Sequence, residues 1–317
     1  MASFSIYIYV CIIVGHYVQY SIQAAIYLCV YFTLILLSVW SLAVTRIVDV
    51  ARVPHDYKVD EETDAALRAC TPIENGQIIL EKSTREQIDQ QIKILERFCN
   101  AMDIVVAECD HVGRIKYCYE CKHVKPDRCR HCSSCDRCVV KFDHHCPWIN
   151  RCVSQSNYKY FLLYIFYSTI TVIWFLLTSF EGVVRYFTNQ EWDKEAGKFA
   201  AIILVGIPFA IFGYYPLGEL LRFHWELIEL NETTCEQAKP AILRFDNMAD
   251  YTMGRAANLK KIFGWGLWFV PLPTDTEDGM HYEIRYVDPN NTSRFKRVEI
   301  DNEDAVETDR EMTQQSD

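Results

Sequence analysis

The sequence predicts an α-helical polytopic membrane protein that has four transmembrane helices and a cytosolic Cys-rich module. Three observations support this fold class. Residues 2–45 contain no Asp, Glu, Lys or Arg. Two further uncharged apolar runs begin near residues 160 and 199. Between the apolar regions, residues 118–152 hold eight of the fourteen cysteines and four of the nine histidines.

The first apolar region, residues 1–45, is long enough for two transmembrane helices. A helix over residues 2–45 would extend about 66 Å, roughly twice the hydrocarbon core of a bilayer. We therefore expect two spans, residues 4–18 and 24–44, with a break between them. A signal peptide is the alternative for the first span. It is disfavoured because no basic residue precedes the apolar run and no small-residue cleavage site follows it.

The second apolar region, residues 160–221, predicts helices at 160–180 and 199–217. The last span contains Pro208 and Pro216, which predict kinks of the kind that neighbouring helices tolerate in a membrane.

Charge distribution predicts the orientation of these helices. Residues 46–159 carry eighteen Lys and Arg, whereas residues 181–198 carry four acids and three bases. By the positive-inside rule, both termini and the Cys-rich region face the cytosol. The cytosol also keeps thiols reduced, as metal binding and thiol catalysis require.

The cytosolic linker, residues 46–117, predicts one helix. Residues 55–80 are polar and unpatterned, which favours a loop. Ser83 and Glu86 have capping-box spacing. Apolar residues then recur at helical spacing, at Ile88, Ile92, Leu95, Cys99, Met102 and Val106. We expect an amphipathic helix packed on the Cys-rich module or the membrane surface, in preference to a partner-binding helix.

The Cys-rich module, residues 118–159, has metal-ligand spacing. Short Cys-x2-Cys steps let two sulfurs reach one zinc ion at about 2.3 Å. Two tetrahedral zinc sites need about eight donors. The stretch offers twelve: Cys118, Cys121, His123, Cys129, His131, Cys132, Cys135, Cys138, His144, His145, Cys146 and Cys152.

The surplus of donors matters because a thiol held by structural zinc is shielded from substrates. Asp143, His144 and Cys146 form a group suited to nucleophilic catalysis. A histidine near a cysteine accepts the thiol proton, and a neighbouring carboxylate orients the imidazole. Spacing alone leaves open whether His144 or His145 is a metal ligand.

Asp-His-His-Cys at residues 143–146, inside this Cys-rich frame, resembles the DHHC-type (zinc-finger) protein S-acyltransferases, or palmitoyltransferases. The resemblance extends over roughly residues 24–270. Further positions match the family spacing: Lys125-Pro126, Arg128, Pro147-Trp148, Asn150, Val153 and Asn157. The resemblance assigns one zinc to Cys118, Cys121, His131 and Cys138. It assigns the other to Cys132, Cys135, His145 and Cys152, which leaves Asp143, His144 and Cys146 free.

The resemblance also implies a two-step acyl transfer. Cys146, deprotonated by His144, attacks an acyl-CoA thioester and then passes the acyl chain to a substrate cysteine. The expected partners are acyl-CoA, the lipid bilayer and membrane-associated proteins with cytosolic cysteines, without nucleic acid. The expected location is the endomembrane system (Golgi or endoplasmic reticulum) or the plasma membrane.

The basic charge of the module suits the CoA phosphates. Residues 114–159 carry ten Lys and Arg against four acids, although the whole chain has net charge −10. Contact with anionic lipid is the alternative role. The candidates for phosphate contact are Lys125, Arg128 and Lys141, with Arg130 and Arg151.

The C-terminal element, residues 222–273, contains two segments similar to family motifs. Thr233-Thr234-Cys235-Glu236 resembles the Thr-Thr-x-Glu element, which implies that Thr234 supports Asp143 and that Glu236 is structural. In the second segment, Asn258 is expected to hydrogen-bond buried backbone. Residues 274–317 carry thirteen acids and five bases, which predicts a disordered tail.

Two positions depart from the family pattern. Arg151 stands where asparagine is common, and Ser154 replaces a glycine at a turn that favours positive φ. Strain at Ser154 would reduce activity, so the alternative function is a catalytically weak, zinc-bearing membrane scaffold. A membrane-anchored RING-like ubiquitin ligase is a weaker alternative, since such ligases do not use Asp-His-His-Cys.

Overall fold

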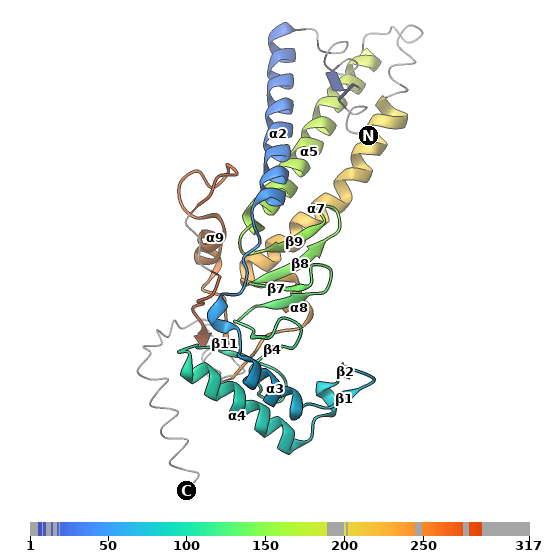
Figure 1. The fold of residues 1–317 in the computed structure, drawn as a ribbon. Coiled ribbons are helices and arrows are strands. Elements are labelled where there is room, and N and C mark those ends of the chain that lie inside the picture. The colour runs from blue at the N-terminus through green and yellow to red at the C-terminus, as the bar shows by residue number, and fades with distance from the viewer. Residues whose placement is uncertain are drawn as a thin grey trace.

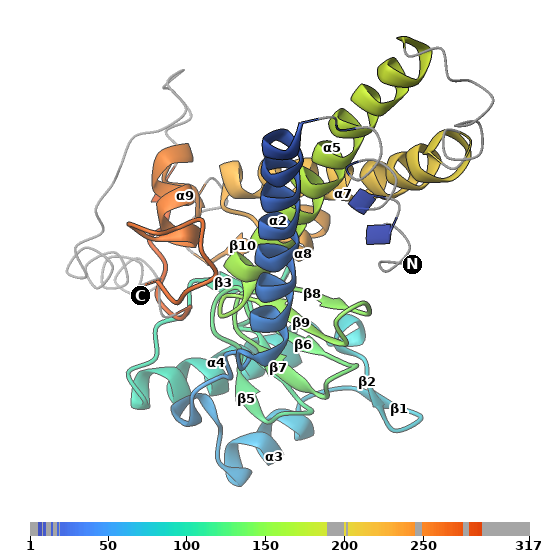
Figure 2. The same ribbon diagram turned by 90° about the horizontal axis from the view of Figure 1, so that it is seen from above.

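The computed structural model describes residues 20–188, 202–244, 249–274 and 279–286, together with residues 6, 7, 9, 10, 14, 18 and 200. Three long helices rise from a module of short strand pairs, and two shorter helices cover the opposite end of that module (Figure 1). The long helices are α2 (Ser21–Ile47), α5 (Tyr158–Thr188) and α7 (Ile207–Leu230). Figure 2 shows that α2, α5 and α7 spread apart with distance from the module.

Two helices in the described part of the chain are long and apolar enough to cross a membrane, Ser21–Ile47 and Tyr158–Val184. They contain the predicted spans 24–44 and 160–180. The two helices pack together, and the hydroxyls of Ser38 and Ser168 lie 2.8 Å apart.

The last predicted span differs from the structure at its end. A π-helical turn, η4 (Ile202–Gly206), leads into α7, which continues thirteen residues beyond residue 217 to Leu230. This extension carries charged residues, and Arg222 bonds with Glu219 and Glu226. The extension brings α7 down onto the Cys-rich module. The predicted first span, residues 4–18, lies mostly outside the described residues.

The Cys-rich module consists of three antiparallel strand pairs. They are β4 (Tyr117–Cys118) with β5 (His123–Val124), β6 (Arg130–Cys132) with β7 (Arg137–Val139), and β8 (Phe142–Cys146) with β9 (Arg151–Ser154). Lys122, Asp136 and Asn150 have positive φ in the connecting turns. The turns at Lys122 and Asp136 bring together the donors of two Cys-x2-Cys steps, Cys118 with Cys121 and Cys132 with Cys135.

The linker is more ordered than its composition predicts. Residues 55–80, expected as loop, contain α3 (Glu61–Ala69), whose first turn is capped by Asp60 accepting from the Thr63 backbone at 2.8 Å. They also hold the pair β1 (Ile73–Glu74) and β2 (Gln77–Ile78). Single turns of 3-10 helix, η2 (His55–Tyr57) and η3 (Leu80–Lys82), flank these elements.

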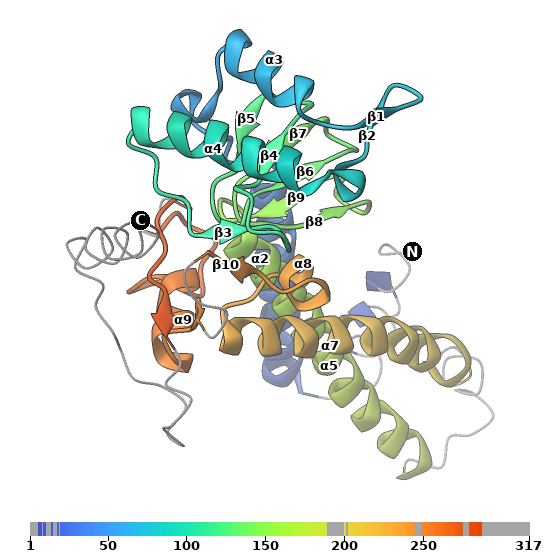
Figure 3. The same cartoon turned by 90° about the horizontal axis from the view of Figure 1, so that it is seen from below.

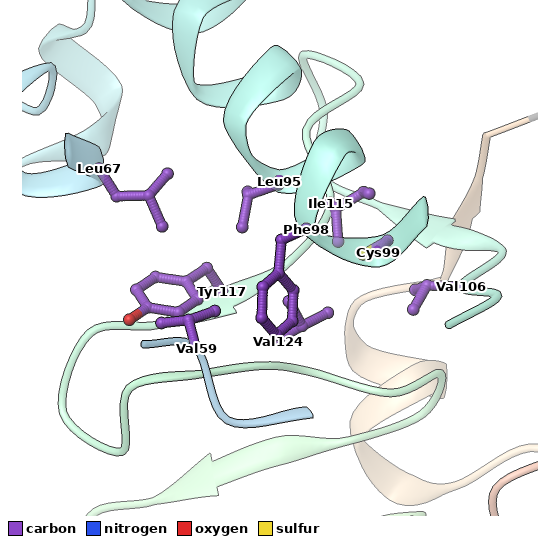
Figure 4. Packing of buried hydrophobic residues seen from close by; sticks show 9 residues of the cluster. All are labelled: Val59, Leu67, Leu95, Phe98, Cys99, Val106, Ile115, Tyr117 and Val124. Atoms are coloured by element: carbon purple, nitrogen blue, oxygen red, sulfur yellow. The ribbon is translucent and has the colours of Figure 1, made fainter. Parts of the chain in front are cut away.

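The predicted amphipathic helix is α4 (Arg85–Ala101). Its capping box uses Thr84 and Gln87, one residue later than the predicted Ser83 and Glu86. The apolar face of α4 packs on the Cys-rich module, as Figure 4 shows. The buried cluster comprises Val59, Leu67, Leu95, Phe98, Cys99, Val106, Ile115, Tyr117 and Val124. Its members come from the linker and from the first strand pair, so linker and module share one core.

The C-terminal region wraps back over the module (Figure 3). It forms α8 (Thr234–Ala238), α9 (Arg255–Phe263), β10 (Ile242–Leu243) paired with β3 (Glu108–Cys109), and β11 (Ala249–Asp250) paired with β12 (Arg285–Tyr286). The predicted disorder from residue 274 is wrong for residues 279–286. There β12 pairs with β11, and Arg285 forms an ion pair with Asp250 at 3.3 Å. Residues 287–317 lie outside the described part.

Candidate active site and metal clusters

Eight donor side chains form two Cys3His clusters. Within each cluster all four donor atoms lie within 4.8 Å of one another. The first cluster comprises Cys118, Cys121, His131 and Cys138, and the second comprises Cys132, Cys135, His145 and Cys152. The second cluster joins the turn between β6 and β7 to the β8–β9 pair. A metal ion there would fix β8 against the rest of the module.

The donor spacing fits tetrahedral zinc. At ordinary zinc bond lengths, a sulfur and a nitrogen ligand lie about 3.5 Å apart. In the first cluster, His131 Nδ1 lies 3.5, 3.4 and 3.9 Å from the sulfurs of Cys118, Cys121 and Cys138. Three sulfurs and one imidazole nitrogen form a common structural zinc set.

The second cluster has the same dimensions. His145 Nδ1 lies 3.6, 3.4 and 3.8 Å from the sulfurs of Cys132, Cys135 and Cys152. Each cluster can therefore hold one metal ion.

Strand β8 separates the metal-binding and catalytic candidates. Successive side chains of a strand point to opposite faces, so His144 and Cys146 share a face and His145 points the other way. His145 joins the second cluster, whereas His144 and Cys146 belong to neither. The geometry therefore favours His145, and not His144, as the metal-ligand candidate.

Cys146 lies where the module meets the long helices α2, α5 and α7. Its side chain is 5% exposed and belongs to a cluster with Ile149, Val153, Phe161 and Ile165. Leu42 of α2, Tyr164 of α5 and Leu221 of α7 pack against the same cluster. The thiol therefore lies among apolar side chains contributed by three long helices, a setting suited to a fatty acyl chain.

Asp143 positions the imidazole of His144. Asp143 Oδ2 lies 2.6 Å from His144 Nδ1, and Asp143 itself is 1% exposed. Thr234 donates its backbone N–H to Asp143 Oδ1 at 2.9 Å and its hydroxyl to Oδ2 at 2.8 Å. Burial alone would raise the pKa of Asp143, but the hydrogen bond and charge of His144, with His224 and the Thr234 backbone, hold that pKa below its ordinary value. These contacts favour the carboxylate form of Asp143, which is placed to orient the ring.

His224 of α7 is a site residue that the sequence did not predict. Its ring lies 6.2 Å from that of His144 and 5.3 Å from that of Phe161. Its Nδ1 lies 3.0 Å from the hydroxyl of Tyr158 at the start of α5. His224 is 1% exposed. A single histidine in an apolar helix does not form a sequence motif that could have predicted this role. The proximity of His224 to β8 depends on how α7 packs.

Arg128 is an interior residue, which corrects its predicted contact with the CoA phosphates. Its guanidinium forms an ion pair with Glu236 at 2.6 Å and donates to the Asn231 backbone carbonyl at 2.6 Å. The rings of Tyr251 and Tyr282 lie 4.7 and 5.1 Å from its Cζ. Because the side chain is fully buried with its charge compensated, it is not placed to meet a soluble phosphate.

The other basic candidates divide into two groups. Lys125 and Arg130 line a cavity of about 250 Å³ together with Lys116 and Lys239. Lys141 is buried near the ring of Tyr282, with its Nζ 5.9 Å from the centroid. Lys141 does not line this cavity, and its contact with the CoA phosphates stays a prediction.

Arg151 and Ser154, the two residues that depart from the family pattern, both lie in β9. Arg151 donates to the Arg46 carbonyl and lies 3.3 Å from Asp49, tying the module to the end of α2. Ser154 does not have the positive φ that was expected, so the predicted backbone strain is wrong. Its buried hydroxyl lacks a hydrogen-bond partner among the described residues.

Asn258 of α9 bonds buried backbone. It is 0% exposed, donates to the Glu229 carbonyl at 2.8 Å and accepts from the Met253 N–H at 3.0 Å. These bonds join the end of α7 to the start of α9.

Comparison with known proteins places this site in a family. Residues 111–241 match the sequence model of the DHHC palmitoyltransferase family. The chain is 56% identical to palmitoyltransferase spe-10 of Caenorhabditis elegans over 295 residues, which is 93% of this chain and 84% of the relative. It is 31% identical to palmitoyltransferase ZDHHC20-A of Danio rerio over 71% of this chain and 62% of the relative.

A further relative, palmitoyltransferase ZDHHC15 of Xenopus laevis, is 30% identical over 55% of this chain and 51% of that protein. The family-model match, residues 111–241, includes both Cys3His clusters and the Asp-His-His-Cys segment. The chain belongs to the DHHC palmitoyltransferase family and is a membrane protein with palmitoyltransferase activity.

Proposed function

We propose that Cys146 carries the palmitoyl group as a thioester between acyl-CoA and the cysteine of a substrate protein. The observation that carries this proposal is the position of Cys146, outside both Cys3His clusters and among apolar side chains of α2, α5 and α7. The acyl chain then lies against these helices, where burial stabilises it by about 0.8 kcal/mol per CH₂.

His144 serves as the proton carrier in both steps. In the first step it accepts the thiol proton of Cys146, whose sulfur attacks the thioester carbonyl, and it returns the proton to the departing CoA thiolate. In the second step it accepts the proton of the substrate thiol, which attacks the acyl-Cys146 carbonyl, and returns it to Cys146. Asp143 stabilises the imidazolium that forms in each step.

The two Cys3His clusters bind structural zinc in this proposal. The donor set and spacing fit zinc, and each ion cross-links segments that are too short to form a stable sheet alone. By holding His145 and Cys152, the second ion fixes the strand pair that carries Asp143, His144 and Cys146.

The basic cavity is the proposed site for the CoA phosphates. Lys116, Lys125, Arg130 and Lys239 line it. The short helix α8 starts at Thr234, beside Asp143, and ends one residue before Lys239, so it spans about 8 Å between the catalytic group and the cavity. Cationic side chains in this cavity suit the charged end of a ligand whose thioester reaches Cys146.

The membrane arrangement is part of the proposal. Four spans cross the bilayer, and the module and both termini face the cytosol of an endomembrane or of the plasma membrane. The basic residues next to α2 and α5 support this orientation.

The acyl intermediate is tested with purified full-length protein in lipid nanodiscs and labelled palmitoyl-CoA. We expect hydroxylamine-sensitive label at Cys146, and its loss in Cys146→Ser. The matched control is Cys235→Ser, because Cys235 also lies beside Asp143, its thiol 3.2 Å from the Asp143 carbonyl. Label that persists in Cys146→Ser and disappears in Cys235→Ser would contradict the proposal.

The CoA position is tested separately by charge reversal. We expect Lys125→Glu with Arg130→Glu to raise the palmitoyl-CoA concentration at half-maximal acylation by roughly tenfold or more. Lys93→Glu with Arg97→Glu, on the exposed face of α4, is the matched control. If both pairs of substitutions raised the required palmitoyl-CoA concentration equally, the cause would be a general change of surface potential and not the loss of a phosphate site.

A further inference from the structure

The segment that follows α9 exposes an unusual group of large apolar side chains. Trp265, Leu267, Trp268, Phe269 and Leu272 are 77, 57, 49, 44 and 41% exposed. Gly264 and Gly266 have positive φ and give this segment its tight turns. Residues 264–272 are called the aromatic loop below.

The aromatic loop is hydrogen-bonded to α5 at two positions along the helix. Near the start of α5, Lys159 donates to the Leu272 carbonyl at 3.1 Å. Eight residues further along the helix, the Tyr167 hydroxyl donates to the Phe269 carbonyl. The loop therefore rises about 12 Å along α5 between these contacts. In Figure 1 the segment beyond α9 (orange) reaches the level of the lower turns of α2.

The upper contact, at Tyr167, lies inside the apolar part of the helix bundle. Ser168, next to Tyr167, is hydrogen-bonded to Ser38 of α2. Ser38 lies eight residues before Arg46, the first charged residue of the chain, and so about 12 Å inside the uncharged run. The tip of the aromatic loop thus lies at a depth where α2 and α5 themselves present apolar side chains to the outside.

The charges beside the loop fit the headgroup region. Lys260 and Lys261 stand in the last turn of α9, and Lys260 Nζ lies 4.6 Å from the centroid of the Trp265 ring. Tryptophan next to lysine is typical of the membrane–water interface, where indole rings lie at the headgroup level. On its other side, α9 is anchored to α5 and α7, where Ile262 packs with Leu162 and Ile228.

We infer that the aromatic loop inserts into the leaflet on the side of the Cys-rich module and is a second membrane anchor of this chain. Continuity with the apolar surface of α2 and α5 identifies the bilayer as the occupant of this face. The loop anchors the C-terminal element to lipid, and through α9 and Asn258 it supports the end of α7, which carries His224. This inference rests on α2 and α5 crossing the bilayer and is independent of the acyl-transfer mechanism.

The test places the photoreactive residue p-benzoylphenylalanine at one position at a time in the full-length protein, in nanodiscs of phosphatidylcholine and phosphatidylserine. The test positions are those of Trp265 and Trp268. Phe32, 45% exposed on α2, is the lipid-facing control, and Ile73, 53% exposed in β1, is the aqueous control. Lipid adducts are identified by peptide mass after irradiation.

We expect lipid adducts at the positions of Trp265 and Trp268 at a yield within about threefold of Phe32, and at least tenfold above Ile73. Adducts at Phe32 alone would overturn the inference while leaving α2 in the bilayer. Covalent dimers formed at the loop positions in place of lipid adducts would also overturn it, because a second copy of the chain would then cover this face. Zinc content is measured in each variant, so that a misfolded variant is recognised and replaced by the other loop position.

Discussion

Thr234 holds both oxygens of the Asp143 carboxylate, with its backbone N–H on Oδ1 and its hydroxyl on Oδ2. The two residues are ninety-one positions apart in the sequence. The contact joins α8 to β8 and makes the C-terminal element part of the proposed catalytic site. Because Oδ2 also bonds His144, the orientation of that imidazole depends on Thr234.

We predict that Thr234→Val slows acylation of Cys146 by roughly tenfold, because a hydrogen bond to a charged group contributes about 1.5–3 kcal/mol and the backbone donor remains. Thr234→Ser keeps the hydroxyl and is the control, with a rate near that of the parent. The acylation rate is measured by rapid quench beside the thermal midpoint. An equal loss of rate in both variants would contradict a role for the hydroxyl.

Both Cys3His clusters should bind zinc. We predict two zinc ions per chain by elemental analysis, about one in Cys135→Ser, and two in Cys146→Ser. Cys129→Ser is a stringent control, because Cys129 is 0% exposed and packs against Cys118 and Cys138 of the first cluster without being one of its four donors. A lower zinc content in Cys129→Ser would show that the ligand assignment of that cluster is wrong.

Arg128 and Arg130 provide a matched pair for separating folding from substrate binding. Arg128→Gln leaves Glu236 buried without its partner, which typically costs about 3–5 kcal/mol, so we predict a strongly lowered thermal midpoint. Arg130→Gln removes a charge from the basic cavity and should change the palmitoyl-CoA dependence with little effect on stability. Normal stability of Arg128→Gln would refute the structural role of the ion pair.

Local spacing identified the twelve candidate donors and the group of Asp143, His144 and Cys146, because these residues occupy one stretch of short turns. The division of eight donors into two sets came from the family resemblance, and the donor atoms of each set lie close together in the structure. The helical spacing of apolar residues also predicted α4. Its capping box begins one residue later than predicted.

Other features of the site depend on contacts between distant segments. The sequence did not predict these features. Arg128 lies in a basic stretch, and it is buried by the return of residues 231–236 and of the rings of Tyr251 and Tyr282. The proximity of His224 to His144 likewise requires the extension of α7 beyond residue 217. The acidic composition of residues 274–317 misled at residues 279–286, because this short part carries one acid and one base and pairs with a partner strand and Asp250.

Asp127 should make stability pH-dependent. It accepts from the backbone N–H groups of Ala107 and Glu108, yet burial, followed by the charge of Glu108, raises its pKa to about 6, against the opposing effect of Lys116. A carboxyl whose pKa is higher in the folded state stabilises the fold at low pH, and that contribution is lost as pH rises through 6. We therefore predict that Asp127→Asn raises the thermal midpoint relative to the parent at pH 7.5, by an amount corresponding to about 3 kcal/mol, and that this advantage falls by roughly half towards pH 5. Both proteins are compared only where each retains two zinc ions, so that loss of metal does not contribute. A constant difference between the two proteins from pH 5 to 7.5 would show that Asp127 does not titrate in this range.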